Sequence, residues 1–447
     1  MTDPLPRLER RPWLPDGAAA RIDDLASSIE PELQATDDRL ASLIERNREI
    51  HEIECVNLNP AANVMNPRAE AMLSANLGSR PSLGYPGEKY EMGLEAVEEI
   101  EVIAAELAAR VFRAPFAEVR VGSGALANLY AFMACAQPGD AIIVPPASIA
   151  GHVTHHSAGA AGLYGLEIHE APIDPDAYTV DLEGVEALAR RIRPAVISLG
   201  SSLNLTPHPV AAIRAIADDV GATVLFDAAH LSGLIAGGAW PDPLSDGAHV
   251  MTMSTYKSLG GPPSGLLVTT EAAIAQRIET IAFPGLTANF DVAKTAALAL
   301  TLLDWLAVGS AYANEMVATA TALADELLAV DVDVHLAHGR PTQSHAFAVQ
   351  SRGHGREGDH GDGHALALRL RRANLLTSAI GVPGDAAGAA SAIRLGTNEM
   401  VRWGMTPSDM PELAALLVRA LHASDPELVA ADVGEFRRRF DRIHFVR

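Results

Sequence analysis

Apolar residues follow two different spacings between about residues 95 and 300. Four runs repeat with the period of an α-helix: Ala96 to Val111, Leu126 to Ala136, Val185 to Ile192 and Val210 to Ala217. Between them lie short apolar runs typical of buried strands: Ala141 to Val144, Ala195 to Leu199, Thr223 to Phe226, Val250 to Met253 and Gly265 to Thr269. This alternation predicts βαβ units. We therefore expect an α/β fold with a mostly parallel central sheet and helices on both of its faces.

The pattern changes at both ends of this region. Near the N-terminus, Leu40, Leu43 and Ile44 stand at helical spacing in a charged stretch, which predicts an amphipathic arm that packs on something else. After about residue 310, long helical stretches surround two expected strands, near Val332 to Leu336 and His345 to Gln350. We predict an N-terminal arm over residues 1–60, a large cofactor-binding domain over 61–310 and a small C-terminal α+β domain over 311–447.

Composition narrows the class of partner. The chain of 447 residues has 34 Lys and Arg against 56 Asp and Glu, a net charge of −22, which argues against a nucleic-acid-binding surface. The best candidate for a membrane helix, Ala293 to Ser310, contains Lys294 and Asp304 and is better explained as a buried helix. With no signal-like start and two cysteines, Cys55 and Cys135, we expect a cytoplasmic protein without a membrane partner.

A Gly, His and Asp tract, SRGHGREGDHGDGH, occupies residues 351–364. Its side chains include metal-ligating types, but their spacing matches no common metal site. A solvated loop is the better interpretation, and no metal is expected.

Two expected strands end in residues that can do chemistry. The strand Thr223 to Phe226 runs into Asp227 and His230, and the strand Val250 to Met253 runs into Ser254 and Lys257. The carboxyl ends of parallel strands form the ligand-binding edge of such a sheet. Lys257 is one of only three lysines in the chain, and a desolvated lysine at this edge can act as a Schiff-base nucleophile. A solvated surface lysine is an equally good interpretation of its spacing alone.

A third element precedes an expected helix. The turn Gly122-Ser123-Gly124-Ala125 presents backbone N–H groups and a hydroxyl at the positive end of the helix, which suits a phosphate. Such a turn is a weak signal by itself. Together with Asp227 and Lys257 it supplies what pyridoxal phosphate needs: a phosphate cradle, an anion for the pyridine nitrogen and an amine.

The chain resembles the serine hydroxymethyltransferases of fold-type-I pyridoxal-phosphate enzymes between about Glu52 and Arg402. The resemblance is carried by the segments GYPGEKY (84–90), SGALAN (123–128), GHVTHH (151–156), LFDAAHLSGLIAGG (225–238), STYKSLGGP (254–262), AFPG (282–285) and IRLGT (393–397). Their order and separation agree with the family almost without gaps. The resemblance implies pyridoxal 5'-phosphate as cofactor and a homodimer whose partner subunit supplies the segment from Gly84 to Glu91 to a shared active site.

The same resemblance implies a role for each matching position. Lys257 would hold the cofactor as a Schiff base, and Asp227 would pair with the pyridinium nitrogen. The other cofactor contacts it implies are Ser123, Gly124 and Ala125 at the phosphate, His152 on the ring, Ser202 and His230 near the phenolic oxygen, and Ser254. Arg394 would bind the substrate α-carboxylate, with Tyr85 and Leu83 lining the substrate pocket. A structural histidine would be the better interpretation of His152 or His230 outside this context.

Departures from the family occur around the pocket mouth. Leu83 stands where the family has the carboxylate associated with folate-dependent proton transfer, and Tyr90-Glu91 replaces paired tyrosines. Tyr256 replaces the histidine before the lysine, and Ala125 replaces the second serine of the phosphate cradle. Gly260 and Pro263 replace two arginines, and Thr287-Ala288-Asn289 replaces Gln-Gly-Gly. The cofactor core is therefore retained while the mouth differs.

These departures favour an aldolase or transaldolase of amino-acid metabolism, which breaks or forms the Cα–Cβ bond of a β-hydroxy amino acid through a glycine quinonoid without folate. Glu91, Tyr90, His230 or a water would accept the β-hydroxyl proton. The first alternative is a folate-dependent serine or α-substituted-serine hydroxymethyltransferase, in which Glu91 replaces the lost carboxylate. Further alternatives are an aminotransferase or decarboxylase on the same fold, and a binding protein without activity.

Overall fold

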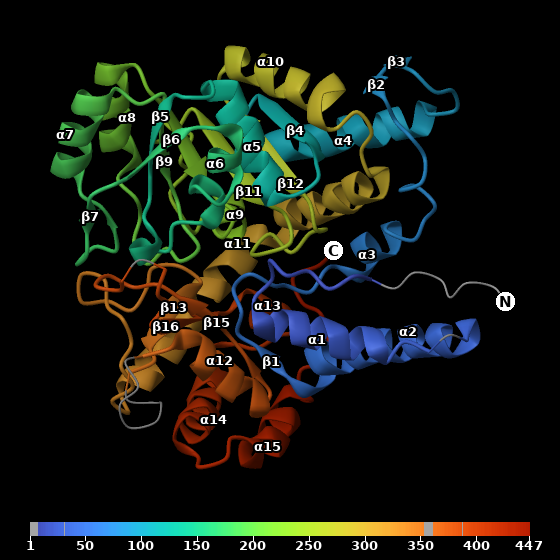
Figure 1. Ribbon diagram of the computed structural model, residues 1–447, viewed down its shortest axis with the longest axis vertical. Helices are drawn as coiled ribbons and strands as arrows, with labels where there is room; N and C mark the ends of the chain where they lie inside the picture. The colour runs from blue at the N-terminus through green and yellow to red at the C-terminus, as the bar shows by residue number, and fades with distance from the viewer. Residues whose placement is uncertain (1–7, 31, 353–360, 387) are drawn as a thin grey trace. The chain divides into compact units, whose positions relative to one another are not determined.

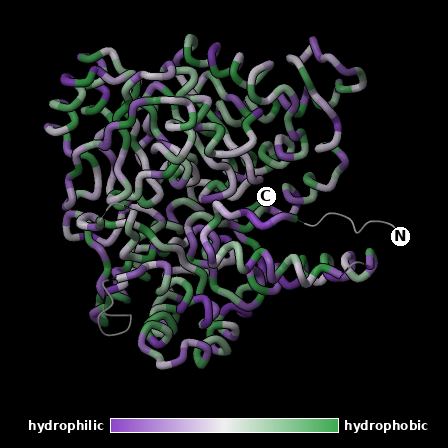
Figure 2. Tube along the Cα trace, in the orientation of Figure 1, coloured by the Kyte–Doolittle hydropathy of each residue, from purple (hydrophilic) through white to green (hydrophobic). Residues whose placement is uncertain are grey.

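The computed structural model describes residues 8–30, 32–352, 361–386 and 388–447, and the chain forms two compact units that divide after Cys55. The first unit holds the helices α1 (Asp16–Ser27) and α2 (Leu33–Arg48) and the π-helix η1 (Glu49–Glu54). Hydrophobic and hydrophilic residues alternate along α1 and α2 (Figure 2). No residue of α2 is buried, and Leu40, Leu43 and Ile44 are more than half exposed. The predicted amphipathic helix is present, and its apolar stripe is exposed.

The second unit contains a seven-stranded sheet of order β4-β12-β11-β10-β9-β5-β6 (Figure 1). Its strands are β4 (Phe116–Val121), β5 (Ala141–Val144), β6 (Glu167–Glu170), β9 (Val196–Leu199), β10 (Thr223–Asp227), β11 (Val250–Ser254) and β12 (Gly265–Thr269). Strands β11, β10, β9, β5 and β6 pair in parallel, and β12 is antiparallel to both of its neighbours. The predicted α/β class with a mostly parallel sheet is confirmed.

Both faces of this sheet are buried. Within β10, Val224 and Phe226 belong to one hydrophobic cluster, whereas Leu225 belongs to another. Successive side chains of a strand point to opposite faces, so two apolar layers must cover the sheet.

The helices and short helical turns of this region are α3 (Pro67–Met72), α4 (Glu95–Val111), α5 (Gly124–Cys135), η2 (Ala147–Ile149), η3 (Val153–His155), α6 (Ala160–Tyr164), α7 (Leu182–Ile192), α8 (Val210–Val220), α9 (Ser232–Ala236), α10 (Ala272–Thr280) and η4 (Ile281–Leu286).

A smaller antiparallel sheet of order β13-β16-β15 follows in the chain (Figure 1). It contains β13 (Ala346–Gln350), β15 (Ser378–Ile380) and β16 (Ala392–Gly396), with the helical elements α12 (Gly363–Arg372), α13 (Asn398–Arg402), η5 (Pro407–Asp409), α14 (Met410–His422) and α15 (Glu427–Arg437). Two-stranded pairs are formed by β1 (Val56–Asn57) with β14 (Leu375–Leu376), β2 (Gly84–Tyr85) with β3 (Glu88–Lys89), and β7 (Ile173–Asp174) with β8 (Thr179–Val180).

The helix α11 (Val292–Leu328) is 37 residues long and continues through the predicted domain boundary at 310. It is long and apolar enough to cross a membrane, but 61% of its most apolar window is buried inside the protein, as in a core helix. The predicted buried helix is therefore its N-terminal half. The domain boundaries themselves stay a prediction.

The secondary structure differs from the expected one at several positions, and one of them is the edge strand β6 of the large sheet, where no strand was expected. The segment Val332 to Leu336 forms no named strand and makes a single bridge, from Val334 to Val349, because the chain turns again at the Ala337–Arg340 bridge. Strand β4 was not expected, because its alternating charges suggest an exposed segment. Instead Glu118 and Arg120 are buried and pair with each other at 2.7 Å.

Of the Gly, His and Asp tract, residues 353–360 lie outside the described residues, and its last residues begin α12.

Candidate active site

Asp227 and Lys257 meet at the carboxyl edge of the large sheet. Asp227 ends β10 and pairs in register with Thr252 of the parallel strand β11, and the chain reaches Lys257 three residues after β11 ends. Both side chains are almost fully buried, Asp227 at 5% and Lys257 at 6% exposure. The β-sheet therefore places the predicted anion and the predicted amine on the same edge.

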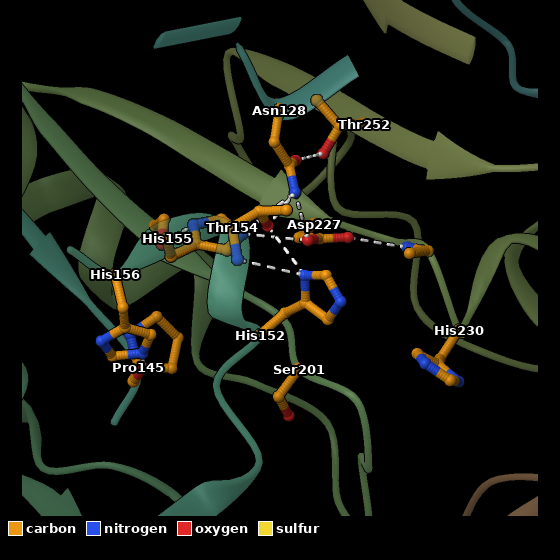
Figure 3. Close-up of polar contacts among 12 residues, drawn as sticks. Asn128, Pro145, His152, Thr154, His155, His156, Ser201, Asp227, His230 and Thr252 are labelled. Atoms are coloured by element: carbon orange, nitrogen blue, oxygen red, sulfur yellow. Dashed lines mark hydrogen bonds and ion pairs between the residues drawn. The ribbon is translucent and has the colours of Figure 1, made fainter. Parts of the chain in front are cut away.

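Asp227 is held as a carboxylate by three hydrogen bonds (Figure 3). Its Oδ2 accepts from Asn128 Nδ2 at 2.8 Å and lies 2.9 Å from His155 Nε2, and its Oδ1 accepts from the Ala229 amide at 2.9 Å. Burial alone would raise the pKa of Asp227, but the hydrogen bond and charge of His155, followed by His152 and Asn128, lower this pKa well below its usual range. The carboxylate therefore stays ionised at every physiological pH.

Asn128 and His155 were missed by sequence reasoning, although both stand inside segments that carry the resemblance. Asn128 lies four residues after Gly124 in α5, and its Oδ1 accepts from Thr252 Oγ1 at 2.6 Å, which fixes the amide so that Nδ2 faces Asp227. His155 is 1% exposed, with Ser198 Oγ 3.1 Å from its other ring nitrogen. A polar residue on the inner face of the helix after the phosphate turn was the available signal.

The two predicted histidines lie beside this pair. His152 caps the turn η3, with its Nδ1 2.8 Å from Thr154 Oγ1, and burial lowers its pKa to about 4. His230 Nε2 lies 3.0 Å from Lys257 Nζ, and no described residue forms a hydrogen bond with its buried Nδ1. Burial, followed by the charges of Lys257 and Arg394, lowers the pKa of His230 well below its usual value. Both imidazoles are therefore neutral at neutral pH.

Lys257 is chemically distinct from the other two lysines. Burial lowers the pKa of Lys257 to about 8, although the negative charge of Asp227 opposes this shift. A useful fraction of the Lys257 amine is therefore neutral near physiological pH. Lys89 is buried in an ion pair with Glu101 at 2.6 Å, and Lys294 lies 3.9 Å from Asp291 at the start of α11. Of the three lysines, Lys257 is the one that has a lowered pKa and lies at the carboxyl edge of the large sheet.

The predicted phosphate cradle lies at the start of α5. Ser123 is the N-cap of this helix and accepts from the Leu126 amide at 3.2 Å, while Ala125 is exposed. A Cβ atom on Gly124 would collide with the side chain of Ser254, so only glycine lets the two segments approach. The free N–H groups of the first helical turn remain available for an anion.

Arg394 brings a second, unpaired cation to the same site from β16. Its Nη1 donates to the Ser202 carbonyl at 2.6 Å and lies 3.4 Å from His230 Nε2. Within the described residues no carboxylate forms an ion pair with Arg394, and burial lowers its pKa to about 10, so it stays charged at neutral pH. A second buried arginine, Arg402, is 1% exposed and packs over the Tyr312 ring at 4.7 Å.

The predicted mouth residues do not join this cluster within one chain. In the hairpin β2–β3, Tyr85 packs edge-on against Phe283 at 5.6 Å, and Tyr90 is 82% exposed. Glu91 Oε2 accepts from the Leu83 amide at 3.3 Å, which places this carboxylate beside the leucine backbone. Among the described residues, no hydrogen bond or ion pair connects the hairpin with Asp227, Lys257 or Arg394, and Figure 1 shows the hairpin away from that sheet edge.

The residues present fit pyridoxal phosphate. A helix N-terminus offers N–H donors, an ionised carboxylate is rigidly supported, and an amine of depressed pKa lies within hydrogen-bonding distance of a neutral histidine. The orphaned His230 Nδ1 is a further polar atom that a bound group can satisfy. Among the described residues, no cluster of His, Cys, Asp and Glu suits a metal ion.

Comparison with known proteins agrees with this geometry. The family model of serine hydroxymethyltransferase matches residues 33–417. The chain is 52% identical over 443 residues to the α-methylserine aldolase of a Ralstonia species and 55% identical over 445 residues to that of Variovorax paradoxus, covering 98% of this chain and 100% and 99% of the relatives. It is 37% identical to the serine hydroxymethyltransferase of Methanopyrus kandleri, covering 88% of this chain and 91% of that protein. The chain therefore belongs to the serine hydroxymethyltransferase family, as its motifs had predicted.

Proposed function

We propose that this enzyme is a pyridoxal-phosphate-dependent aldolase that acts on an α-methyl β-hydroxy amino acid, releasing an aldehyde from Cβ without folate. The observation that carries the proposal is that the Lys257 amine and the unpaired Arg394 guanidinium both approach His230 Nε2, at 3.0 and 3.4 Å. That arrangement suits an α-amino acid, which presents an amine and a carboxylate from one carbon. The names of the relatives at 52–55% identity support the α-methyl substituent.

Bound cofactor would supply an electron-withdrawing ring that accepts the electron pair left on Cα when the Cα–Cβ bond breaks. Asp227, supported by His155 and Asn128, would keep the ring nitrogen protonated. Arg394 would fix the carboxylate and thereby the rotation of the bond that breaks. Small hydrogen-bonding groups around these side chains are buried, so the charges act in a medium of low dielectric constant.

Cleavage also requires a group that takes the proton of the β-hydroxyl. Among the side chains considered for this step, His230 is the one that the same chain places 3.0 Å from Lys257 Nζ. Its lowered pKa keeps the imidazole neutral, and Nε2, which faces the N–H groups of Lys257 and Arg394, is the nitrogen that would accept the proton. The β-hydroxyl proton would move to Nε2, the Cβ–O bond would become a carbonyl as Cα–Cβ breaks, and a proton would return to Cα.

Leu83 supports the folate-independent form of the reaction. A leucine cannot transfer a proton, and its half-buried side chain makes that wall apolar. The second candidate, a folate-dependent hydroxymethyltransferase, is favoured by one observation, the Glu91 carboxylate beside the Leu83 amide at 3.3 Å. Exchanging Glu91 for glutamine would separate the two, because only the second candidate loses folate-stimulated turnover.

We also propose a cytoplasmic homodimer in which the hairpin Gly84–Glu91 of one subunit reaches the active site of the other. Exposed Tyr90 and Met92, at 82% and 84%, support this proposal, since such side chains gain from burial at an interface. Within the chain, the Lys89–Glu101 ion pair fixes the hairpin on α4 and gives it a rigid base. The measured mass of the purified protein in solution tests the dimer.

The direct test is substrate screening of the purified enzyme. α-Methylserine, serine and allo-threonine are each incubated with and without tetrahydrofolate, and aldehyde, keto acid and carbon dioxide are quantified. The proposal expects formaldehyde and alanine from α-methylserine at a rate that folate does not change. Release of a keto acid or of carbon dioxide would instead indicate the aminotransferase or decarboxylase. Borohydride reduction followed by peptide mapping would locate the cofactor, which we expect on Lys257.

A further inference from the structure

The Arg394 side chain is fixed on two sides before any substrate arrives. Its Nε donates to Ser378 Oγ at 2.8 Å, and its Nη1 donates to the Ser202 carbonyl at 2.6 Å. Residues 378 and 394 face each other directly in the antiparallel pairing of β15 with β16. Residue 348, which flanks Arg394 on the other side, is an alanine and offers no hydrogen bond. Ser378 is therefore the cross-strand neighbour that orients the guanidinium.

The Ser378 hydroxyl is itself oriented by Asn59. Its proton points to Asn59 Oδ1 at 3.1 Å, which leaves its lone pairs for Arg394 Nε. The Asn59 side chain also accepts from the Ala61 amide at 3.1 Å, and the Asn59 amide donates to Asn57 Oδ1 at 3.1 Å. This segment is anchored by β1, which pairs with β14 two residues before Ser378. Asn59 and Ser378, which are 319 positions apart, thus form one hydrogen-bonded chain that ends on Arg394.

We propose that Ser378 and Asn59 are positioning residues that hold Arg394 in the orientation that binds a substrate carboxylate. Nε is bonded to Ser378, and Nη1 is bonded to the Ser202 carbonyl and lies 3.4 Å from His230 Nε2. Nη2 is the guanidinium nitrogen for which no described residue supplies a hydrogen bond, so its N–H groups are left for the carboxylate. Without Ser378, a long side chain that has no acidic partner among the described residues would sample other rotamers. The inference rests on the proposed function only in taking Arg394 as the carboxylate site.

Calorimetric titration of the holoenzyme with serine and with ethanolamine, which lacks the carboxylate, tests this role. We expect Ser378→Ala to raise the dissociation constant of serine about tenfold, the size of a lost hydrogen bond to a charged group, and to leave that of ethanolamine unchanged. Ser378→Thr keeps the hydroxyl and should restore serine binding. Ser351→Ala is the matched control. The Ser351 hydroxyl donates to the backbone carbonyl of Ser391 at 2.6 Å, beside the same small sheet, and does not contact Arg394.

A double-mutant cycle distinguishes the joint action of Ser378 and Asn59 on Arg394 from a general loss of structure. Asn59→Ala should weaken serine binding about threefold, and the double variant with Ser378→Ala should bind no worse than Ser378→Ala alone, since both act through one contact. Asn59→Asp keeps the acceptor oxygen and should bind serine like the wild type. An equal loss of serine and ethanolamine binding in Ser378→Ala, or additive effects of the two alanines, would overturn the inference.

These outcomes do not depend on the aldolase reaction. If no aldehyde were released but the serine-specific loss persisted, the proposed reaction would be wrong and the positioning role would stand. If Arg394→Lys weakened serine binding and Ser378→Ala did not, the carboxylate site would stand and the positioning role would be wrong.

Discussion

The sheet edge around Asp227 and the hairpin around Leu83 are built in opposite ways. Asp227, Asn128 and His155 are buried and joined to one another by hydrogen bonds within one chain. On the hairpin, Tyr90 is 82% exposed and Leu83 is held chiefly through its backbone, by Glu91 and by the Tyr90 amide. The first region is fixed before any ligand binds, whereas the second presents the exposed side chains of Tyr90 and Met92.

This difference accounts for the departures from the family on the hairpin, at Leu83 and Tyr90-Glu91, whereas Asp227 and Lys257 at the sheet edge match the family. When one residue of a buried hydrogen-bonded set is substituted, the polar groups of its neighbours lose their hydrogen-bond partners. Substitutions in such a set are therefore costly. An exposed side chain has no such partners, so the mouth can change and redirect the chemistry toward another substrate. The comparison predicts large effects for changes at the edge and small, substrate-specific effects for changes on the hairpin.

The largest effect is expected from Asp227→Asn. A neutral amide cannot hold the ring nitrogen of the cofactor protonated, so turnover should fall roughly a thousandfold while the fold is retained. Steady-state kinetics with α-methylserine, alongside circular dichroism, measure both quantities. Wild-type turnover in this variant would show that the buried edge does not carry the chemistry.

The second expectation concerns pH and the protein stripped of its cofactor. Burial lowers the pKa of Lys257 from its ordinary value of 10.5 to about 8 in the folded chain, so the unfolded state binds more protons between these values. The free energy of unfolding should therefore rise with pH from 8 to 10.5, by at most about 3 kcal/mol. Denaturant melts across this range should show the rise, and Lys257→Met should abolish it. An identical rise in that variant would assign the titration to another group.

His155→Leu should have an intermediate effect. Loss of its hydrogen bond raises the pKa of Asp227 and loosens the carboxylate, so kcat should fall about 10- to 100-fold. His335→Leu is the matched control. The His335 ring packs edge-on against the Tyr178 ring, with 5.3 Å between the ring centroids, and it makes no contact with Asp227. Equal losses in both variants would mean that any histidine removed from the interior has this effect.

The smallest effect should come from the mouth. Leu83→Ala removes part of an apolar wall and should lower kcat/KM about fivefold for substrates with an apolar β-substituent, leaving cofactor affinity unchanged. The ratio of kcat/KM between apolar and hydroxylated β-substituents measures this selectivity. Leu163→Ala, at an 84% exposed position in α6, should leave the ratio unchanged. A large loss of cofactor binding in Leu83→Ala would contradict the separation of edge from mouth.

Much of the fold followed from apolar periodicity, because buried parallel strands and amphipathic helices leave a strong local signal. Strand β4 escaped this reasoning, since its Glu118 and Arg120 look exposed in sequence and are instead buried as a pair. The short segment from Val332 to Leu336 was expected to pair along its length and makes one bridge, because neighbouring turns limit the pairing. Local pattern does not report how far a partner strand extends.

The sequence by itself determined that Asp227 and Lys257 lie at the ends of two strands and that the motifs around them belong to one family. Only the tertiary structure decided that His155 and Asn128 support Asp227, and that Asn59 and Ser378 reach Arg394 from segments 319 residues apart. It also left Tyr90 and Leu83 away from Lys257 within one chain. Hydrogen bonds depend on distances of about 3 Å and on direction, and these are fixed by packing between segments whose separation in sequence carries no such information.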